Sequence, residues 1–80
     1  DAAFYPNPLT NNVTTLRFNN PNHLPHCLIL TNMLGQQAGA WTEITSNTIS
    51  ISKERLSKGI YCYRLMNEHD IVAYGKLYVD

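Results

Sequence analysis

The chain has 80 residues, and its six Lys or Arg balance its six Asp or Glu, so its formal net charge is zero. This length allows one domain with a small core, and the balanced charge leaves no electrostatic case for nucleic acid or an anionic membrane surface as a partner. Only 15% of the residues are charged, against about 25% in typical soluble proteins, which indicates an extracytoplasmic module rather than a cytosolic enzyme.

The start of the sequence carries no targeting signal. It begins with Asp1 rather than Met, and no basic segment precedes an apolar one. No apolar run approaches the roughly 18 residues of a transmembrane segment. We therefore expect residues 1–80 to form a single domain that is a fragment of a longer chain.

The first third of the chain predicts two strands separated by a rigid turn. A short edge strand ends at Tyr5, because Pro6 and Pro8 lack the N–H group that a strand ladder needs. Residues 13–18 alternate in polarity, which predicts the second strand. The segment 19–25 is rich in Asn and Pro and predicts a loop.

The middle of the chain predicts three more strands. Residues 26–32 alternate, and the turn at residues 32–36 contains Gly35, the natural candidate for a positive φ. Residues 36–45 are poorly patterned and predict an irregular strand. Residues 49–52 alternate cleanly again.

Residues 56–65 have the spacing of a tyrosine corner. Leu56, Gly59 and Tyr61 lie where a loop opens into a strand, and in this device the Tyr hydroxyl bonds back to the preceding loop. The ring enters the core while its polar tip satisfies backbone that would otherwise lack a partner. One helical turn fits into the residues around the loop, 53–58.

The last part of the chain predicts a hairpin. Residues 67–70 form a polar turn, and Ile71–Val79 forms the final strand. Together with the earlier segments this gives about seven strands and no helix of ordinary length. The sequence therefore predicts an all-β fold, a small immunoglobulin-like antiparallel β-sandwich.

Cys27 and Cys62 permit one disulfide but do not require it. In an immunoglobulin domain the second Cys follows the corner Tyr by two positions and faces inward, whereas Cys62 follows Tyr61 by one. Cys62 should therefore face away from the core. We expect two free thiols that behave as small apolar side chains.

The sequence contains no catalytic constellation. There is no Gly-x-Ser-x-Gly elbow, no phosphate-binding Gly-rich loop and no His-Glu-x-x-His motif, and the acidic residues form no pair suited to acid/base catalysis. We therefore predict no catalytic residue and no enzymatic activity.

A short segment brings three potential metal ligands close together in sequence. His23, His26 and Cys27 are near neighbours, and Cys62 or His69 would complete a tetrahedral site. A proline stiffens this spacing, and a His at the start of a strand is ordinary. We expect no metal and no other cofactor.

Exposed aromatic residues leave a second function open. Trp41, Tyr74 and Tyr78 are candidates for a platform that binds carbohydrate, as in many small sandwiches from secreted enzymes. A purely structural module is a third possibility. A micromolar hit in a glycan screen would favour the carbohydrate-binding alternative.

Four segments occur in a characteristic order. The first is Tyr5-Pro6-Asn7-Pro8, and the second is the apolar strand and turn at residues 28–36. The third joins residues 49–51 to Leu56-x-x-Gly59-Ile60-Tyr61, and the fourth is Gly75-Lys76-Leu77-Tyr78-Val79. In this order they resemble the type A C-terminal sorting domain of the type IX secretion system of Bacteroidetes, with Asn32 in place of the usual Asp.

This resemblance implies a secretion and sorting signal. Domains of this family end secreted proteins, and the outer-membrane secretion machinery recognises the folded domain. In many cargoes a sortase-like C-terminal signal peptidase at the cell surface then removes it. The resemblance therefore implies a C-terminal sorting domain over residues 1–80, an upstream cargo domain in the same chain, and export through the periplasm and outer membrane to the medium or the cell surface.

The candidate signal residues follow from these segments. They are Tyr5, Pro6, Asn7, Pro8, Gly35, Leu56, Gly59, Tyr61, Gly75, Lys76, Leu77 and Val79. A sandwich this small exposes backbone along its edge strands, and such edges recruit partners by strand addition. We expect Ile71–Val79 to be such an edge, read by the machinery together with the turn at residues 5–8.

Overall fold

The computed structural model describes residues 2–80, and within them the chain forms seven strands and one short 3-10 helix. The strands are β1 (Ala3–Tyr5), β2 (Val13–Arg17), β3 (His26–Asn32), β4 (Gln37–Ile44), β5 (Thr48–Ser52), β6 (Gly59–Met66) and β7 (Ile71–Val79). The 3-10 helix η1 (Lys53–Arg55) supplies the helical turn expected before the tyrosine corner. The final strand has the predicted bounds.

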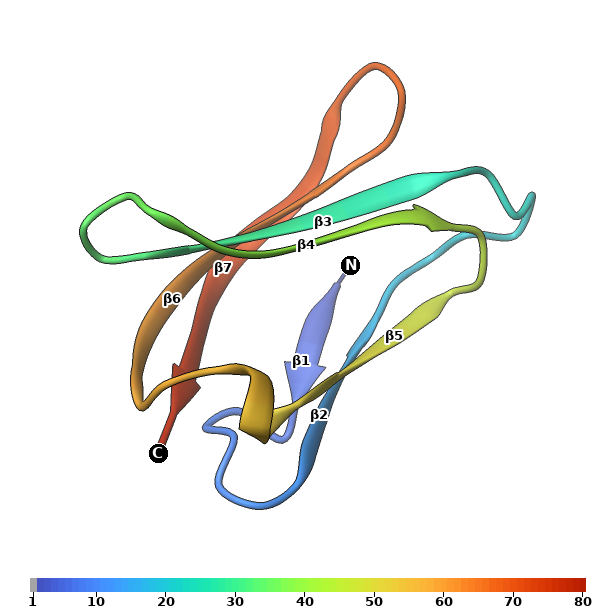
Figure 1. The fold of residues 1–80 in the computed structure, drawn as a ribbon. Coiled ribbons are helices and arrows are strands. Elements are labelled where there is room, and N and C mark those ends of the chain that lie inside the picture. Colours follow the sequence, from blue (N-terminus) through green and yellow to red (C-terminus); the bar gives the residue numbers. More distant parts are fainter. Residues whose placement is uncertain (1) are drawn as a thin grey trace.

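The strands form two antiparallel sheets that pack as a small sandwich (Figure 1). One sheet has the order β1-β2-β5, and the other has the order β4-β3-β6-β7. β1 and β7 are therefore edge strands of different sheets. The predicted fold class is confirmed.

The core lies between the two sheets and follows the alternation of each strand. On β6 the side chains of Tyr61, Tyr63 and Leu65 are buried, whereas Cys62 and Arg64 lie on the outer face. Successive side chains of a strand point to opposite faces, so this period fixes which residues enter the core. The predicted inward direction of Tyr61 and outward direction of Cys62 are confirmed.

β4 is irregular, as its patterning predicts. Its pairing with β3 shifts register between His26 and Leu28 and again between Leu30 and Thr31. Trp41 is opposite Leu28 and packs against the core.

The loop before β3 is fixed by Asn20, a buried amide. Its Nδ2 lies 3.0 to 3.2 Å from the carbonyl oxygens of Leu24, Thr45 and Ser46, and its Oδ1 accepts from the Leu24 N–H at 3.0 Å. Within residues 2–80 no buried side-chain nitrogen or oxygen lacks a partner.

Candidate functional site

The turn after β1 lies against the edge of β7. The Asn7 Nδ2 donates to the carbonyl of Lys76 at 2.9 Å, and the N–H of Tyr78 donates to the Asn7 Oδ1 at 2.9 Å. One side-chain amide thus makes the two hydrogen bonds that a peptide group of a neighbouring strand would make. The first and last predicted motifs, 69 to 71 positions apart in sequence, are therefore adjacent.

Leu9 extends this contact. Its N–H donates to the carbonyl of Tyr78 at 2.7 Å, and its carbonyl accepts from the N–H of Asp80 at 3.0 Å, which forms a parallel bridge between Leu9 and Val79. The Leu9 side chain is fully buried. Residues 7–9 therefore act as a short additional strand on β7, and the sequence prediction did not include Leu9.

The turn itself is held from both sides. The peptide bonds Tyr5-Pro6 and Asn7-Pro8 are cis, and the carbonyl of Pro6 accepts from the buried hydroxyl of Thr14 at 2.6 Å. Tyr5 has 80% of its surface exposed. A well-anchored backbone therefore presents an aromatic ring to solvent.

The motif at the end of β7 is divided between core and surface. Leu77 and Val79 are buried, whereas Lys76 is exposed. A Cβ atom on Gly75 would lie 2.9 Å from Cε2 and 3.0 Å from Oη of Tyr63, so only Gly allows the ring to pack this closely. Burial raises the pKa of Tyr63 above its ordinary value.

Asn32 organises the turn between β3 and β4. Its Oδ1 accepts from the N–H groups of Leu34 at 3.0 Å and Gln36 at 2.9 Å, and its carbonyl accepts from the N–H of Gly35 at 3.0 Å. Gly35 has a φ of 85°, as predicted. Asn32 therefore keeps the acceptor role that an Asp carboxylate would have in this turn.

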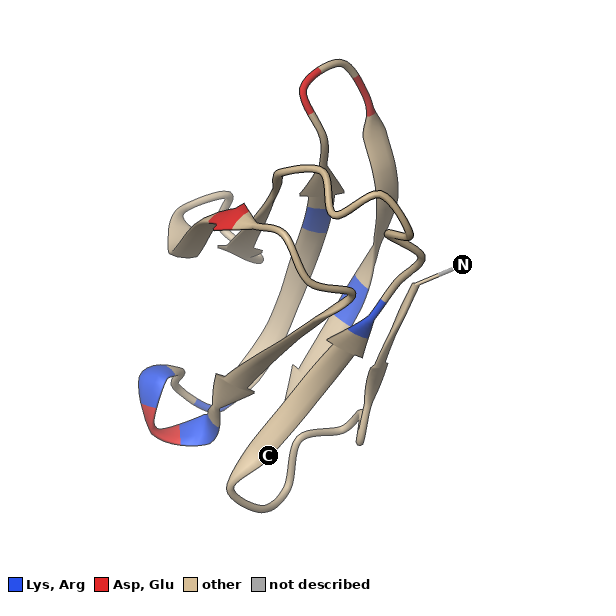
Figure 2. Ribbon diagram, turned by 90° about the vertical axis from the view of Figure 1, so that its right-hand side faces the viewer, with Lys and Arg blue, Asp and Glu red and all other residues tan. Residues whose placement is uncertain are grey.

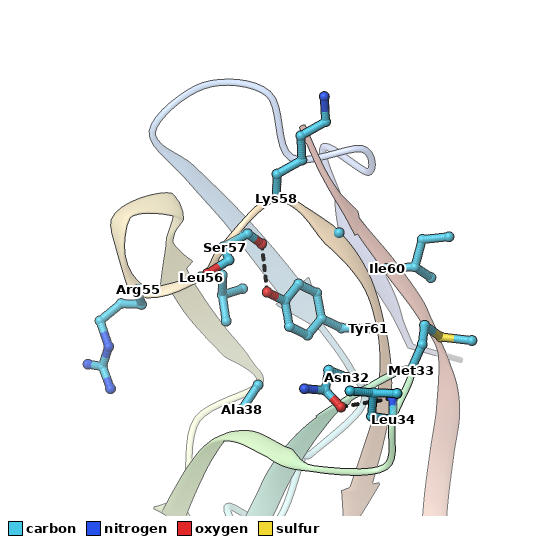
Figure 3. A pocket seen from close by; sticks show the side chains of 11 residues that line it. Asn32, Met33, Leu34, Ala38, Arg55, Leu56, Ser57, Lys58, Ile60 and Tyr61 are labelled. Carbon is cyan, nitrogen blue, oxygen red and sulfur yellow. Dashed lines mark hydrogen bonds between the residues drawn. The ribbon is translucent and has the colours of Figure 1, made fainter.

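Tyr61 forms the predicted tyrosine corner. Its hydroxyl donates to the carbonyl of Ser57 at 2.6 Å, and its ring is buried beside Leu56 (Figure 3). Leu56 is partly buried and packs against the core. Gly59 begins β6 immediately after this loop.

Replacing Tyr61 with Phe is expected to lower the free energy of unfolding by about 1 kcal/mol. The substitution removes the donor to the Ser57 carbonyl and keeps the packing of the ring. Urea denaturation measures the difference. Tyr74→Phe is the matched control, because this Tyr is 79% exposed and its hydroxyl is in solvent. Unchanged stability of Tyr61→Phe would contradict the role of the corner.

The second and third motifs border one groove (Figure 3). Its volume is about 480 Å³, and it lies between the β3–β4 turn and the loop that precedes β6. We call it the corner groove; residues 32–34, Ala38 and residues 55–61 line it. Of the predicted signal residues, the three in the tyrosine corner line this groove, and Gly35 lies in the turn at its border.

The candidate metal ligands are not brought together. Among residues 2–80 no group of three His, Cys, Asp or Glu side chains is placed to hold a metal ion. The Nδ1 of His23 is 3.1 Å from the carbonyl oxygen of Thr45, and the Nδ1 of His26 is 2.8 Å from that of Leu24. Both imidazole rings therefore hydrogen-bond to the backbone of loops rather than to a common ligand position.

The two cysteines are free, as expected. Cys27 lies opposite Met66, and Cys62 lies opposite Thr31, so the thiols are four ladder positions apart on neighbouring strands. At about 3.4 Å per residue this separation far exceeds the roughly 7 Å limit between Cα atoms in a disulfide.

The prediction of an aromatic platform that includes Trp41 is wrong. The Trp41 ring faces the core, and the guanidinium carbon of Arg55 lies 5.9 Å from its centroid. Tyr74 and Tyr78 lie on the opposite, outer face of their sheet. The poor patterning of residues 36–45 did not indicate which face Trp41 occupies, and the register shifts of β4 place it opposite the buried Leu28.

Charged residues are few and lie mostly in turns (Figure 2). Glu68 and Asp70 lie in the connection between β6 and β7, and three more charged residues form η1. On the outer face of the second sheet, Arg64 and Lys76 are the basic residues of β6 and β7. Within residues 2–80 no helix is long and apolar enough to cross a membrane.

Comparison with known proteins assigns the chain to a family. A search of curated proteins found no match. The family model described as the secretion system C-terminal sorting domain matches residues 3–80, a range that contains both the contact between residues 7–9 and β7 and the corner groove. The chain therefore belongs to the family of C-terminal sorting domains of the type IX secretion system, which mark proteins for export across the outer membrane to be secreted or attached to the surface.

Proposed function

We propose that the export signal is a composite surface made by the turn at residues 5–8 and the end of β7. The observation that carries this proposal is the pair of hydrogen bonds between the Asn7 amide and the backbone of Lys76 and Tyr78. They hold the turn that carries the exposed Tyr5 against the strand that carries the exposed Lys76. The secretion machinery reads these side chains together.

The same contact changes the role of the edge of β7. An open docking edge was predicted over the whole strand, but backbone groups of Lys76, Tyr78 and Asp80 are bonded to residues 7–9. The prediction is wrong for that half of the edge, because a partner strand cannot add where residues 7–9 lie. We therefore propose that the machinery contacts side chains there, and that strand addition is confined to residues 71–74.

An attached cargo and a processing enzyme complete the proposal. The cargo is an upstream domain of the same chain, and a sortase-like peptidase at the cell surface removes the sorting domain. Sorting domains of this family are not themselves catalytic, and we propose no reaction for this one. The position of β1 supports the arrangement, since an edge strand allows a preceding segment to leave the sandwich without crossing its core (Figure 1).

Secretion of a reporter fused in front of the domain tests this function in a host with a type IX system. Tyr5→Ser and Lys76→Glu are expected to reduce secretion by about tenfold each, as loss of an interface residue worth about 1.4 kcal/mol would. Leu24→Ser is the control, because Leu24 is 54% exposed and lies outside both the turn at residues 5–8 and β7. A tag after Asp80 that is absent from the secreted product reports removal of the domain.

Two outcomes would contradict the proposal. A wild-type fusion that stays in the cell would exclude the sorting role. Secretion of Tyr5→Ser and Lys76→Glu at the level of Leu24→Ser would place recognition elsewhere. Urea denaturation of the purified variants should give the wild-type midpoint, because these side chains are exposed.

A further inference from the structure

We propose that the corner groove is a second docking site, which binds an extended segment with apolar and acidic side chains from a protein of the secretion machinery. This inference rests on the sorting function and adds the chemistry of the partner. The groove is formed by the β3–β4 turn and the tyrosine corner, which are distant in sequence.

Exposed apolar side chains line the groove. Leu34 is 84% exposed and Met33 is 59% exposed, both from the β3–β4 turn, and Ile60 of β6 is 40% exposed (Figure 3). Leu56 and Tyr61 also line the groove. Single exposed apolar residues are ordinary, but three around one hollow of about 480 Å³ make a surface that gains from being covered.

The rim of the groove is basic. Arg55 and Lys58 line it, and none of its lining residues within 2–80 is Asp or Glu. Arg55 is held at the rim by its contact with the Trp41 ring, and the Lys58 side chain extends away from the loop on another side (Figure 3). A partner segment with a carboxylate next to an apolar residue would complement both the basic side chains of the rim and the apolar side chains that line the groove.

The backbone of β6 suits an extended partner. The ladder between β3 and β6 ends at the pair Asn32 and Tyr61, because β3 turns away there. β6 continues to Gly59 and is paired over Ile60 on its β7 side. A segment bound in the groove would therefore pair with β6 at Ile60, on the side of β6 where β3 has ended. Its alternate side chains would point into the hollow.

A protein segment fits better than an anionic lipid surface. Glu54 and Asp80 line the neighbouring hollow together with Lys53 and Lys58, so the hollow itself has no excess of positive charge. A flat anionic membrane that reached Lys58 would approach these carboxylates as well, and the chain has no net positive charge to offset them. A narrow peptide avoids this repulsion.

The reporter fusion also tests this site, with Leu34→Asp and Lys58→Glu as variants. Each is expected to reduce secretion by about tenfold or more. Leu24→Asp and Arg17→Glu are the matched controls, because Leu24 is 54% exposed and Arg17 is exposed on β2, both outside the groove. The controls should change secretion by less than about twofold, since exposed positions outside an interface contribute little.

Folding is checked by the urea midpoint of each purified variant. Should Leu34→Asp shift that midpoint, Leu34→Ser replaces it in the secretion assay. The proposal is overturned if the wild-type fusion is secreted and both groove variants are secreted like their controls; the sorting function then stands. A wild-type fusion that is not secreted removes the sorting function and this proposal together.

A separate measurement distinguishes a protein partner from a lipid one. The purified domain is sedimented with phosphatidylglycerol vesicles, and we expect it to remain in the supernatant. Binding to the vesicles that Lys58→Glu abolishes would assign the groove to a lipid surface and overturn the proposal of a peptide.

Discussion

Replacing Gly75 with Val is expected to lower the free energy of unfolding by about 1–3 kcal/mol. The new Cβ would lie 2.9 to 3.1 Å from three atoms of the Tyr63 side chain, two in the ring and the hydroxyl oxygen. The ring has little room to retreat, because it packs edge-on against Phe4 with a centroid distance of 5.0 Å and an interplanar angle of 88°. Small domains are stable by only about 5–15 kcal/mol, so the loss should be plain in urea denaturation.

A second-site variant tests the cause of this loss. Tyr63→Leu shortens the side chain that faces Gly75, so Gly75→Val should cost at least about 1 kcal/mol less in that background, in the usual range of coupling between residues in contact. An equal cost in both backgrounds would mean that the Tyr63 ring is not the obstacle.

Replacing Asn7 with Ala is expected to lower the free energy of unfolding by about 1–2 kcal/mol, since two hydrogen bonds of ordinary strength are lost. The substitution also exposes backbone groups of Lys76 and Tyr78 at the edge of β7. Free edges promote pairing between chains, so the variant should self-associate at high concentration. Urea denaturation and sedimentation velocity measure the two effects.

Two variants sharpen this prediction. Asn7→Asp keeps the shape and the acceptor for the Tyr78 N–H, but a carboxylate cannot donate to the Lys76 carbonyl, so it too should destabilise at neutral pH. Asn22→Ala changes an exposed Asn in a loop and is expected to leave stability unchanged. A monomeric Asn7→Ala with wild-type stability would show that the turn is held without the amide.

Features that depend on neighbouring residues were predictable from the sequence. The position of Cys62 one residue after Tyr61 indicated that it faces outward, and the spacing of Leu56, Gly59 and Tyr61 indicated the tyrosine corner. The turn after β3 indicated the positive φ of Gly35. Each follows from the two-residue period of a strand or from turn chemistry, which act within a few residues.

Features that depend on pairing between distant segments were not predictable. The bonds of Asn7 and Leu9 to β7 leave no local pattern, and the register shifts of β4 hide the inward direction of Trp41. Both segments that line the corner groove, the β3–β4 turn and the loop before β6, were identified as motifs in the sequence. That they lie side by side depends on the pairing of Asn32 with Tyr61. Long-range register decides these contacts.

The bridge between Leu9 and Val79 also has a consequence for the order of events during export. Because chains are synthesised from the N-terminus, residues 7–9 cannot pair with β7 until residues 76–80 have been synthesised and β7 has joined its sheet. A truncated or partly folded chain contains Tyr5 and Asn7 but does not assemble them with Lys76. The proposed composite signal would therefore report that the domain is complete, and it would withhold unfinished molecules from the secretion pathway.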